Sequence, residues 1–585
     1  MLPGSPERST KLGLVSRNIL RRYWPFFVLL TGLLWFSASN YAPRQYRLGS
    51  FLRPGRPPGA PRPPEINVPN GDLWAGRANE ARKAFVHAYK GYQRYALPHD
   101  ELKPMSGEAI DNFHGWGVTM YDSLDTMWLM GLEDMFWDTV HDVEKQTFDM
   151  PLDAPTKQYA HFFEVVIRYL GGILSAYALS EDPRLLRLAD TLGEKLMPAF
   201  SSPSGWPYWG VHTVTGATVG PGGQSSYTCL AEALSNQMEF KYLAHITGKA
   251  AYYEATERPM DAMYDQDNIR YGGLYAKIWN LNTGKPNQTD YAIGGCADSA
   301  YEYFLKQWLM TGQREPKARD LYIRSANAII EKLLYVGANR PLLYATDIDA
   351  GKPDHGFEHL SCFLPALFAL GAHTPALSPH LTPADRERHL WAAEGLANTC
   401  WTLYADMESG LSPDKVAMEQ SGESERGRWV LLLKAWEDGG REGAPPGVGA
   451  VERQAERGRR GYVPLKDAYL LRPETVETFY LMWRTTGDVK WRERGWAVFE
   501  SLEKFSRVKY GYSSVRYLDE KKGAPYRYDD MPSWFMAETL KYLFLLFTDE
   551  DLVPLDKWVF NTEAHPFPVF QWSPKEVDDY RIFVE

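Results

Sequence analysis

The chain has 585 residues, of which 44% are hydrophobic and 24% charged, a composition typical of a globular protein with an ample core. Its formal net charge of −10 at pH 7 argues against nucleic acid as the main partner, because polyanions bind to an excess of Lys and Arg. Aromatic residues make up 14% of the chain, a content that sugar-binding clefts and large helical cores share.

The residues before position 72 are predicted to lie outside the folded domain. Residues 23–39 form an apolar run without a charge, near the short limit for a membrane span, and basic residues precede it. This pattern predicts a cytosolic tail over 1–22 and an uncleaved transmembrane anchor over 23–39, with a cleaved signal peptide as the alternative. Residues 40–71 are rich in Pro and Arg and predict an extended stem. The domain over 72–585 would then be lumenal.

From residue 72 onward the sequence repeats a unit of two helices joined by a tight polar turn. Each unit has an apolar first helix and an amphipathic second helix, as in residues 167–196, 240–264, 304–334 and 479–505. Alternation of buried and half-exposed helices predicts an all-α barrel, although a helical solenoid would share the pattern. The positions of acidic residues, described below, favour the barrel.

One segment interrupts this repeat of helical pairs. Residues 434–461 are rich in Gly and charge and predict a surface insertion or a disordered loop without chemistry.

Asn287-Gln288-Thr289 is a glycosylation sequon and fits a lumenal loop. The cysteines include no CxxC pair, which argues against a zinc knuckle or a thioredoxin-type site.

Acidic residues recur in the apolar helices or in their first turns. They are Glu164 with Arg168 four residues later, Glu232, Asp298 with Glu302, Glu474 and Glu477 after Arg472, and Glu538. Glu302 and Glu477 lie at the same spacing before the glycines that follow their helices, so a barrel would gather such residues at one end.

A single acid at a helix start is usually a cap, and an acid four residues before an arginine is usually an ion pair. A group of carboxylates in the buried helices of one domain is different, because unpaired buried charge is expensive. Such a group is typical of a site that binds a cation or a polyol, or that performs acid–base chemistry. Without a nucleophile motif, a phosphate loop or a zinc helix, paired carboxylates indicate glycoside hydrolysis, and the pocket would suit a hard cation such as calcium.

These motifs resemble those of the class I α-1,2-mannosidases, glycoside hydrolase family 47. The resemblance runs from about Trp74 to about Pro568 through "GWGVTMYDSLDTMWLMGL", "FFEVVIRYLGGILSAY", "ADSAYEYFLKQW", "EHLSCFLPALFALGA", "LLRPETVETFYLMWRTTGD" and "VFNTEAHPF". It implies an (α/α)7 barrel, inverting hydrolysis of terminal α-1,2-linked mannose, and a calcium ion at the barrel floor.

The resemblance also assigns roles to residues. Glu164 would be the general acid, Glu474 the general base, and Asp298 a third catalytic carboxylate that could deliver the proton instead of Glu164. Thr562 would bind calcium through its hydroxyl and its carbonyl. The remaining residues would line the site, hold calcium-bound waters or bind the sugar: Arg168, Glu232, His359, Arg472, Glu477, Glu538, Glu563 and Trp534, which stands where the family usually has Phe.

The cysteines divide into two pairs under this resemblance. Cys362 and Cys400 match the disulfide of the family, whereas Cys229 and Cys296 have no counterpart and are expected to be free and buried. Enzymes of the strict ER type generally carry Arg at the position of Cys296, so Cys296 favours broader, Golgi-like trimming.

We therefore expect a calcium-dependent exo-mannosidase. Two alternative hypotheses belong to other functional classes: a mannose-binding quality-control factor and an inactive barrel scaffold. The enzyme would be a monomeric, single-pass type II protein of the ER or Golgi membrane that acts on high-mannose N-glycans. The full set of acids argues against the scaffold, which has no reason to bury them.

Overall fold

The computed structural model describes residues 56, 59–66, 68–69, 71–152, 158–223, 226–264, 272–287, 290–420, 426–520 and 525–585. The chain divides into two units, Met1–Arg53 and Pro54–Glu585, and every described residue belongs to the second. The predicted tail over 1–22, the anchor over 23–39 and most of the stem over 40–71 lie outside the described residues. So do Gln288 and Thr289 of the sequon.

A ring of buried helices forms the centre of the second unit. Each packs against the next, and the π-helical turn η9 (Phe535–Thr539) that leads into the last helix packs against the first, which closes the ring. The inner helices are α3 (Val118–Leu129), α6 (Gly171–Ser180), α9 (Gln237–Thr247), α11 (Asp298–Met310), α13 (Leu364–His373), α16 (Glu474–Thr486) and α18 (Leu540–Phe547).

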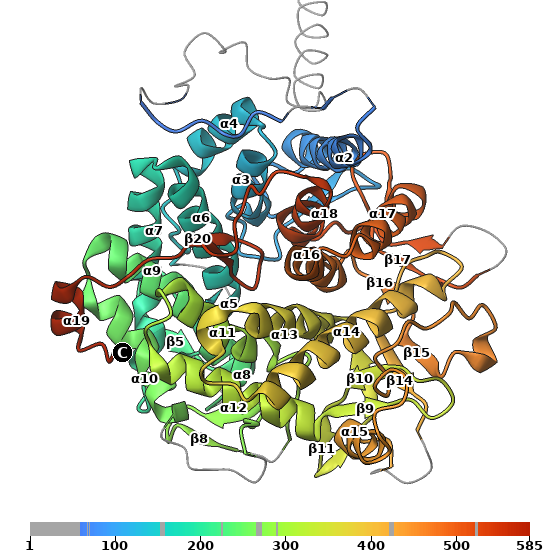
Figure 1. The fold of residues 1–585 in the computed structure, drawn as a ribbon. Helices are drawn as coiled ribbons and strands as arrows, with labels where there is room; N and C mark the ends of the chain where they lie inside the picture. The colour runs from blue at the N-terminus through green and yellow to red at the C-terminus, as the bar shows by residue number, and fades with distance from the viewer. Residues whose placement is uncertain are drawn as a thin grey trace, which may run out of the picture. The chain divides into compact units, whose positions relative to one another are not determined.

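A second set of helices covers the ring from outside. Each inner helix packs against one outer helix: α3 on α4 (Glu133–Val143), α6 on α7 (Pro183–Leu196), α9 on α10 (Ala250–Tyr264), α11 on α12 (Pro316–Lys332), α13 on α14 (Pro383–Ala405), α16 on α17 (Lys490–Ser501) and α18 on α2 (Leu73–Tyr95). In Figure 1 the chain colour runs round this assembly until the red α18 lies beside the blue α2. The unit is therefore an α-helical barrel.

The predicted two-helix units are confirmed. The four repeats in the sequence correspond to α6–α7, α9–α10, α11–α12 and α16–α17. Three of their turns contain a glycine in the left-handed conformation, Gly248, Gly312 and Gly487, which residues with a side chain adopt only at a cost, and the α6–α7 turn has Glu181 in that conformation. The apolar first helices are inside because they bury hydrophobic side chains all round.

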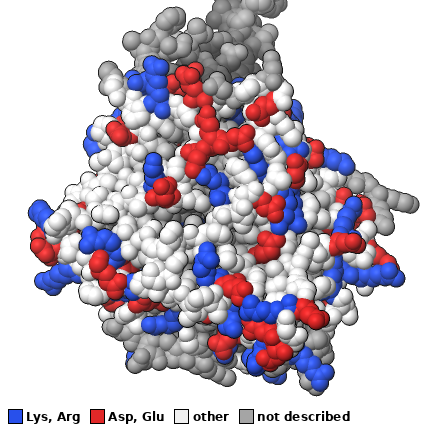
Figure 2. Space-filling model, viewed as in Figure 1, with Lys and Arg blue, Asp and Glu red and all other residues white. Residues whose placement is uncertain are grey.

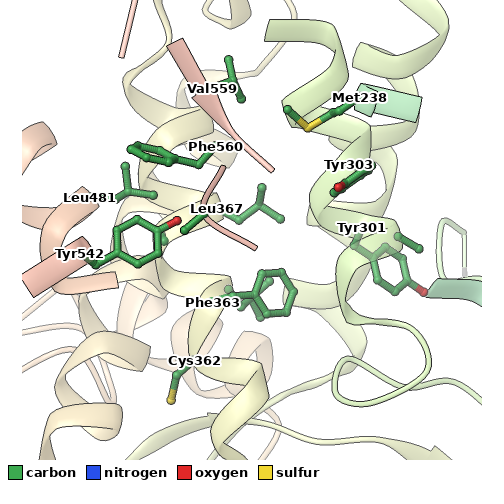
Figure 3. Packing of buried hydrophobic residues seen from close by; sticks show 14 of the residues in the cluster. Met238, Tyr301, Tyr303, Cys362, Phe363, Leu367, Leu481, Tyr542, Val559 and Phe560 are labelled. Carbon is green, nitrogen blue, oxygen red and sulfur yellow. The ribbon is translucent and has the colours of Figure 1, made fainter. Parts of the chain in front are cut away.

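A β-hairpin enters the ring and brings its tip to the centre. Strand β19 (Trp558–Phe560) pairs antiparallel with β20 (Pro566–Pro568), and Asn561–His565 form the tip. Figure 3 shows Phe560 beside Leu481 and Tyr542 of the inner helices, and the rings of Phe560 and Tyr542 have centroids 5.4 Å apart. This packing fixes the tip, which carries Thr562 and Glu563.

Short strands and helices connect the helical pairs at the barrel ends. All strand pairs are antiparallel. The sheets are β1–β2 (Glu101–Lys103, Glu108–Ile110), β3–β4–β5 (Ala160–His161, Gly210–Val211, Thr218–Val219), β6–β7–β8 (Tyr227–Cys229, Ile278–Asn280, Lys285–Pro286), β9–β10 (Leu334–Val336, Leu343–Ala345), β11–β12 (Ile348–Asp349, Lys352–Pro353), β13–β14–β15 (Gly356–Glu358, Lys415–Met418, Tyr462–Lys466) and β16–β17–β18 (Ala468–Tyr469, Val515–Arg516, Tyr526–Arg527). The connecting helices include α5 (Phe162–Glu164), α8 (Leu230–Leu234), α15 (Trp429–Asp438) and α19 (Pro574–Tyr580).

Among the described residues, one helix is long and apolar enough to cross a membrane, Phe162–Ser180. Its most apolar window is 72% buried inside the barrel, where it forms the inner helix that ends in α6. Its apolar character is therefore that of a core helix.

The expectation that Cys229 and Cys296 are free and buried is wrong. They form a disulfide with Cα atoms 5.2 Å apart, and both side chains are only half-buried. The predicted Cys362–Cys400 disulfide is present as well, and no described cysteine is free. Sequence alone missed the first pair because its two cysteines meet only when β6 and the loop before α11 lie side by side.

Residues 434–461 lie mostly on the surface, as expected of an insertion, but they follow one ordered path. Residues 434–438 complete α15, and the rest is anchored from the barrel side. The Asn398 amide donates to the Val448 carbonyl at 3.0 Å, and the Trp429 indole donates to the Pro446 carbonyl at 2.8 Å. On the face shown in Figure 2, acidic and basic side chains are interspersed over the second unit.

Candidate active site

A cavity of about 370 Å³ opens into the barrel between the inner helices and the hairpin tip. Every residue that the sequence assigned to catalysis, sugar or metal lines it, with the exception of His359. The predicted residues on its wall are Glu164, Arg168, Glu232, Asp298, Arg472, Glu474, Glu477, Trp534, Glu538, Thr562 and Glu563.

The wall is built from helix starts and from two irregular helical turns. Asp298 and Glu474 are the first residues of α11 and α16, where the free N–H groups and the helix dipole favour negative charge. Glu164 directly precedes the π-helical turn η2 (Val165–Leu170), and Glu538 lies within η9. Such turns are frequent at functional sites because they redirect side chains within a helix.

Arg168 joins carboxylates that come from different parts of the chain. Its Nε donates to Glu164 Oε2 at 2.8 Å, and its Nη1 donates to Glu563 Oε2 at 2.5 Å. Burial lowers the pKa of Arg168, but the neighbouring carboxylates Glu563, Glu164 and Asp122 outweigh burial and raise it overall. Arg168 therefore stays charged and holds Glu164 beside the hairpin tip.

His359 lies behind Glu474 and does not line the cavity. Its Nδ1 is 2.6 Å from Glu474 Oε2, and its Nε2 is 2.7 Å from the Tyr404 hydroxyl and 3.1 Å from that of Thr475. The imidazole is 1% exposed, so it is positioned to orient Glu474. The resemblance had assigned His359 to binding or orienting the sugar, whereas the structure places its ring against the carboxylate of Glu474.

Arg472 and Trp534 form another part of the wall. Arg472 Nε donates to Asp414 Oδ1 at 2.5 Å, and its Nη1 is 3.8 Å from Glu474 Oε1. The guanidinium carbons of Arg168 and Arg472 lie 5.4 and 5.8 Å from the centre of the Trp534 ring. The Trp534 indole donates to the Leu470 carbonyl at 3.1 Å, which fixes the plane of the ring.

Asp298 is one of the carboxyl groups of the wall with a raised pKa. Burial is the main cause and the charges of Glu302, Glu474 and Glu358 add to it, so that the pKa is raised to about 7 although the Ser299 N–H donates to this carboxyl. A carboxyl with such a pKa carries a proton near neutral pH and can donate it.

A second group of carboxyls lies deeper, next to the hairpin tip. Burial and the charges of Glu302 and Glu474 raise the pKa of Glu477 to about 8, although Lys306 opposes them. Burial and the charges of Asp122 and Glu164 raise the pKa of Glu563 to about 7, although Arg168 opposes them. Burial and the charges of Glu563, Glu474 and Glu477 place the pKa of Glu538 well above its ordinary value. Lys306 is the buried cation of this group and contacts Glu302, with Glu477 Oε1 at 3.5 Å.

The chemistry of this group fits a hard divalent cation. Within the described part of the chain, no three His, Cys, Asp or Glu side chains are placed to hold a metal by themselves. The predicted site does not need three, since Thr562 offers a hydroxyl and a carbonyl, and the carboxylates would act through waters. The excess of negative charge around Thr562 is what such a cation would offset.

Sequence reasoning missed four contributors to this site. They are Lys306, Asp414, His161 and the wall position of Glu302, which was noticed but not assigned a role. The Nε2 atom of His161 is 3.2 Å from Glu232 Oε1. The His161 ring stacks on the Trp209 ring, with centroids 4.6 Å apart. The spacing of four residues between Glu302 and Lys306 was the local signal for this contact, but it does not reveal that Glu477 of another inner helix lies 3.5 Å away.

Comparison with known proteins gives a consistent result. The family model described as glycosyl hydrolase family 47 matches residues 84–569. The endoplasmic reticulum mannosyl-oligosaccharide 1,2-alpha-mannosidase of Rattus norvegicus is 36% identical over 503 residues, which are 85% of this chain and 69% of the relative. The mannosyl-oligosaccharide 1,2-alpha-mannosidase IB of Homo sapiens is 35% identical over 522 residues, 88% of this chain and 73% of the relative.

A solved structure supports the same result. The alpha-1,2-mannosidase from Trichoderma reesei superposes with a TM-score of 0.73 at 28% identity, over 84% of this chain and 99% of that protein.

Proposed function

The chain belongs to glycosyl hydrolase family 47, and from that premise we propose that it removes terminal α-1,2-linked mannose from high-mannose N-glycans with inversion at the anomeric carbon. The observation that carries this proposal is one cavity wall on which an oriented carboxylate, a protonated carboxyl and two arginines converge. Hydrolysis of a glycosidic bond needs a base for water, an acid for the leaving oxygen and groups that hold the sugar.

Glu474 is the proposed base. It is the first residue of α16, its Oε1 lies 3.8 Å from Arg472 Nη1, and His359 Nδ1 holds its Oε2 at 2.6 Å. The other oxygen is left to accept a proton from the attacking water. The hydrogen-bonded series Tyr404, His359 and Glu474 therefore keeps the base in one orientation during turnover.

The proton donor is one of two carboxyls, and electrostatics favours Asp298 in the unliganded protein. Glu164 already accepts a hydrogen bond from Arg168 Nε at 2.8 Å, which holds its carboxyl group on the arginine. The pKa of Asp298 is raised to about 7 by burial and by neighbouring carboxylates, so Asp298 holds a proton at neutral pH. Glu164 would then bind the sugar or relay the proton through a water.

The remaining wall residues would hold the terminal mannose. Arg168 and Arg472 donate hydrogen bonds to hydroxyls, Glu232 accepts them, and the Trp534 ring offers an apolar face to the sugar ring. Glu232 Oε2 is buried and has no partner in the described structure, which suits an acceptor that waits for a hydroxyl.

We propose calcium as the cofactor, held by Thr562 directly and by Glu477, Glu538 and Glu563 through waters. When bound, such an ion supplies positive charge to orient sugar hydroxyls and offset the carboxylates. The protein itself orients the water at Glu474 and holds the proton at Asp298.

The setting of the enzyme is part of the proposal. The inner and outer helices pair seven times, which supports an (α/α)7 barrel. We propose a monomer anchored by residues 23–39, with the barrel in the lumen of the ER or Golgi. Cys296, bonded to Cys229, lines the cavity and is shorter than the arginine of the ER-type enzymes. We propose that the cavity therefore accepts more than one mannose branch, one after another.

The direct test uses the purified full-length protein and a panel of mannobioses. We expect cleavage of the α-1,2-linked disaccharide and at least about a hundred-fold slower cleavage of the α-1,3 and α-1,6 isomers, because misplaced substrates lose orientation. Proton NMR with the methyl glycoside of the α-1,2 isomer, whose second product keeps its anomeric carbon blocked, should show β-mannose as the first free mannose. Initial release of α-mannose would contradict inversion, and binding without release would favour the mannose-binding quality-control factor.

A further inference from the structure

Two carboxyls of the cavity wall lie just after cysteines that are bonded to each other. Cys229 ends β6 and precedes Glu232 of α8, whereas Cys296 precedes Asp298, the first residue of α11. The disulfide joins these segments, which are 67 residues apart in sequence, and Cys296 itself lines the cavity. The covalent bond thus sits between a predicted sugar ligand and the predicted proton donor.

The loop that carries Cys296 and Asp298 is held at several points. The Ala231 N–H donates to the Cys296 carbonyl at 2.9 Å, and the Ser235 hydroxyl donates to that of Ser299 at 2.8 Å. The Gly295 N–H donates to Glu358 Oε2 at 3.1 Å. These contacts set the register between the start of α8 and the start of α11.

Cys296 has a backbone conformation that a residue with a side chain adopts at a cost. Its φ is +78°, in the left-handed region where glycine is the usual residue. The disulfide tethers this residue through its side chain. If the bond were opened, the loop could relax toward a more common conformation, and Asp298, two residues away, would move with it.

The two disulfides of the protein differ in access. Cys362, in the turn before α13, and Cys400, within α14, are 1% and 0% exposed and lie in the core. Cys229 and Cys296 are half-buried, and Cys296 borders the cavity that a glycan would fill. A small reductant therefore reaches the Cys229–Cys296 disulfide first, and a sugar bound in the cavity would block its access.

We propose that the Cys229–Cys296 disulfide is a thiol-sensitive positioning element that holds Asp298 and Glu232 in register for catalysis. This inference rests on the proposed function. Its opening would lower turnover while the barrel stays folded, because the helical core and the Cys362–Cys400 bond do not depend on it.

The redox step needs a dithiol as the reductant. One thiolate attacks a sulfur of the pair, the Cys229–Cys296 bond breaks, and the sulfur that leaves takes up a proton. The second thiolate of the reagent then displaces the remaining cysteine and releases the reagent as a cyclic disulfide. Two electrons pass from the dithiol to the protein, which ends with two thiols.

The first experiment follows the bond without relying on activity. The native full-length protein is treated with dithiothreitol, labelled with iodoacetamide and mapped by mass spectrometry, with and without α-1,2-mannobiose. We expect labels on Cys229 and Cys296 before Cys362 and Cys400, and slower labelling with the disaccharide. Labelling of Cys362 and Cys400 first, or no labelling without denaturant, would overturn the proposal.

The second experiment measures catalysis of the Cys229→Ser/Cys296→Ser double variant. We expect kcat to fall at least about tenfold with KM changed less, since a shift of about 1 Å in a reacting group can cost a hundred-fold. The limb of the pH profile near 7 should move, which a purely structural bond would not cause. Dithiothreitol should have no effect on this variant.

A matched control is the Cys362→Ser/Cys400→Ser variant, which should lose thermal stability yet keep its sensitivity to dithiothreitol. Unchanged kcat and pH profile in the Cys229→Ser/Cys296→Ser variant would refute the positioning role. If the wild-type protein released no mannose at all, the proposed function would fail, whereas the labelling order would still report on the disulfide.

Discussion

Two buried charged clusters lie within the barrel, and they differ in balance. Behind the cavity, Asp125 Oδ1 lies 2.8 Å from Lys541 Nζ and its Oδ2 lies 2.7 Å from His565 Nδ1, with all three side chains fully buried. Burial raises the pKa of Asp125, but Lys541 and His565 outweigh it, so the pKa is lowered overall. At the cavity, Glu477, Glu538 and Glu563 have raised pKa values, with Lys306 and Arg168 as the nearby cations.

The difference separates a structural cluster from a functional one. The Asp125 cluster is matched in charge and anchors the hairpin tip, since Lys541 Nζ also donates to the Ala564 carbonyl at 2.6 Å. The cavity cluster has more acids than cations, which costs stability unless a ligand or metal offsets it. Burial of acids is common to both, whereas excess charge is confined to the cavity.

The largest expected effect is at the proposed base. Glu474→Gln should lower kcat by about 10²–10⁴-fold, because the amide cannot accept the proton of the attacking water. Affinity for mannobiose, measured by calorimetry, should change little. The control is Glu493→Gln on the outer helix α17, where the acid pairs with Arg77 at the surface and its loss should leave kcat unchanged. Normal turnover of Glu474→Gln would remove the base assignment.

The next effect separates Asp298 from Glu164. Asp298→Asn should lower kcat for glycans by about 10²-fold but spare α-mannosyl fluoride, whose leaving group needs no proton. In the wild-type protein kcat should fall as pH rises through about 7, because Asp298 then loses its proton, and this limb should vanish in the variant. The same pattern in Glu164→Gln, with Asp298→Asn inactive on the fluoride, would reverse the assignment.

The matched cluster should respond in stability. Asp125→Asn leaves Lys541 without its carboxylate and leaves His565 with Asp122, whose Oδ1 is 3.4 Å from its Nε2, so the free energy of unfolding should fall by about 3–5 kcal/mol. Urea denaturation of the calcium-free protein measures this change. Glu538→Gln, in the unmatched cluster, should not lower stability in the same assay, because burial and the charges of Glu563 and Glu477 already disfavour the ionised form of this carboxyl, which the neutral amide can replace. Equal losses in the two variants would erase the distinction between the clusters.

Features that depend on one segment of the chain can be predicted from the sequence, whereas contacts between distant segments cannot. Helical pairs follow from apolar periodicity within one segment, and Glu164, Asp298 and Glu474 stand out because acids interrupt apolar helices. The position of His359 behind Glu474 could not be foreseen, because α16 and the turn before α13 meet only in the folded barrel.

The same reason explains the missed disulfide and the missed cation. Cys229 and Cys296 lie far apart in sequence, and the resemblance offered no partner for either. Lys306 looks like an ordinary helix residue until Glu477, from another inner helix, lies 3.5 Å away. Pairings between segments depend on tertiary packing, which local patterns do not encode.

The most direct test of the account is the pH dependence of stability with and without calcium. In the folded calcium-free protein Glu477 and Glu563 have pKa values of about 8 and about 7, above the ordinary 4.5, so the native state binds more protons than the unfolded chain between these limits. Stability should therefore fall as pH rises from 5 to 8.

Calcium should reverse that trend and restore mannose release in the same sample. At a hundred times its dissociation constant it should add about 2.7 kcal/mol to the free energy of unfolding, most clearly at pH 8, where the carboxylates are ionised. A melting temperature that rises with pH in the chelated protein, or that does not respond to calcium while mannose is still released, would contradict the claim that excess negative charge marks a cation-assisted sugar site.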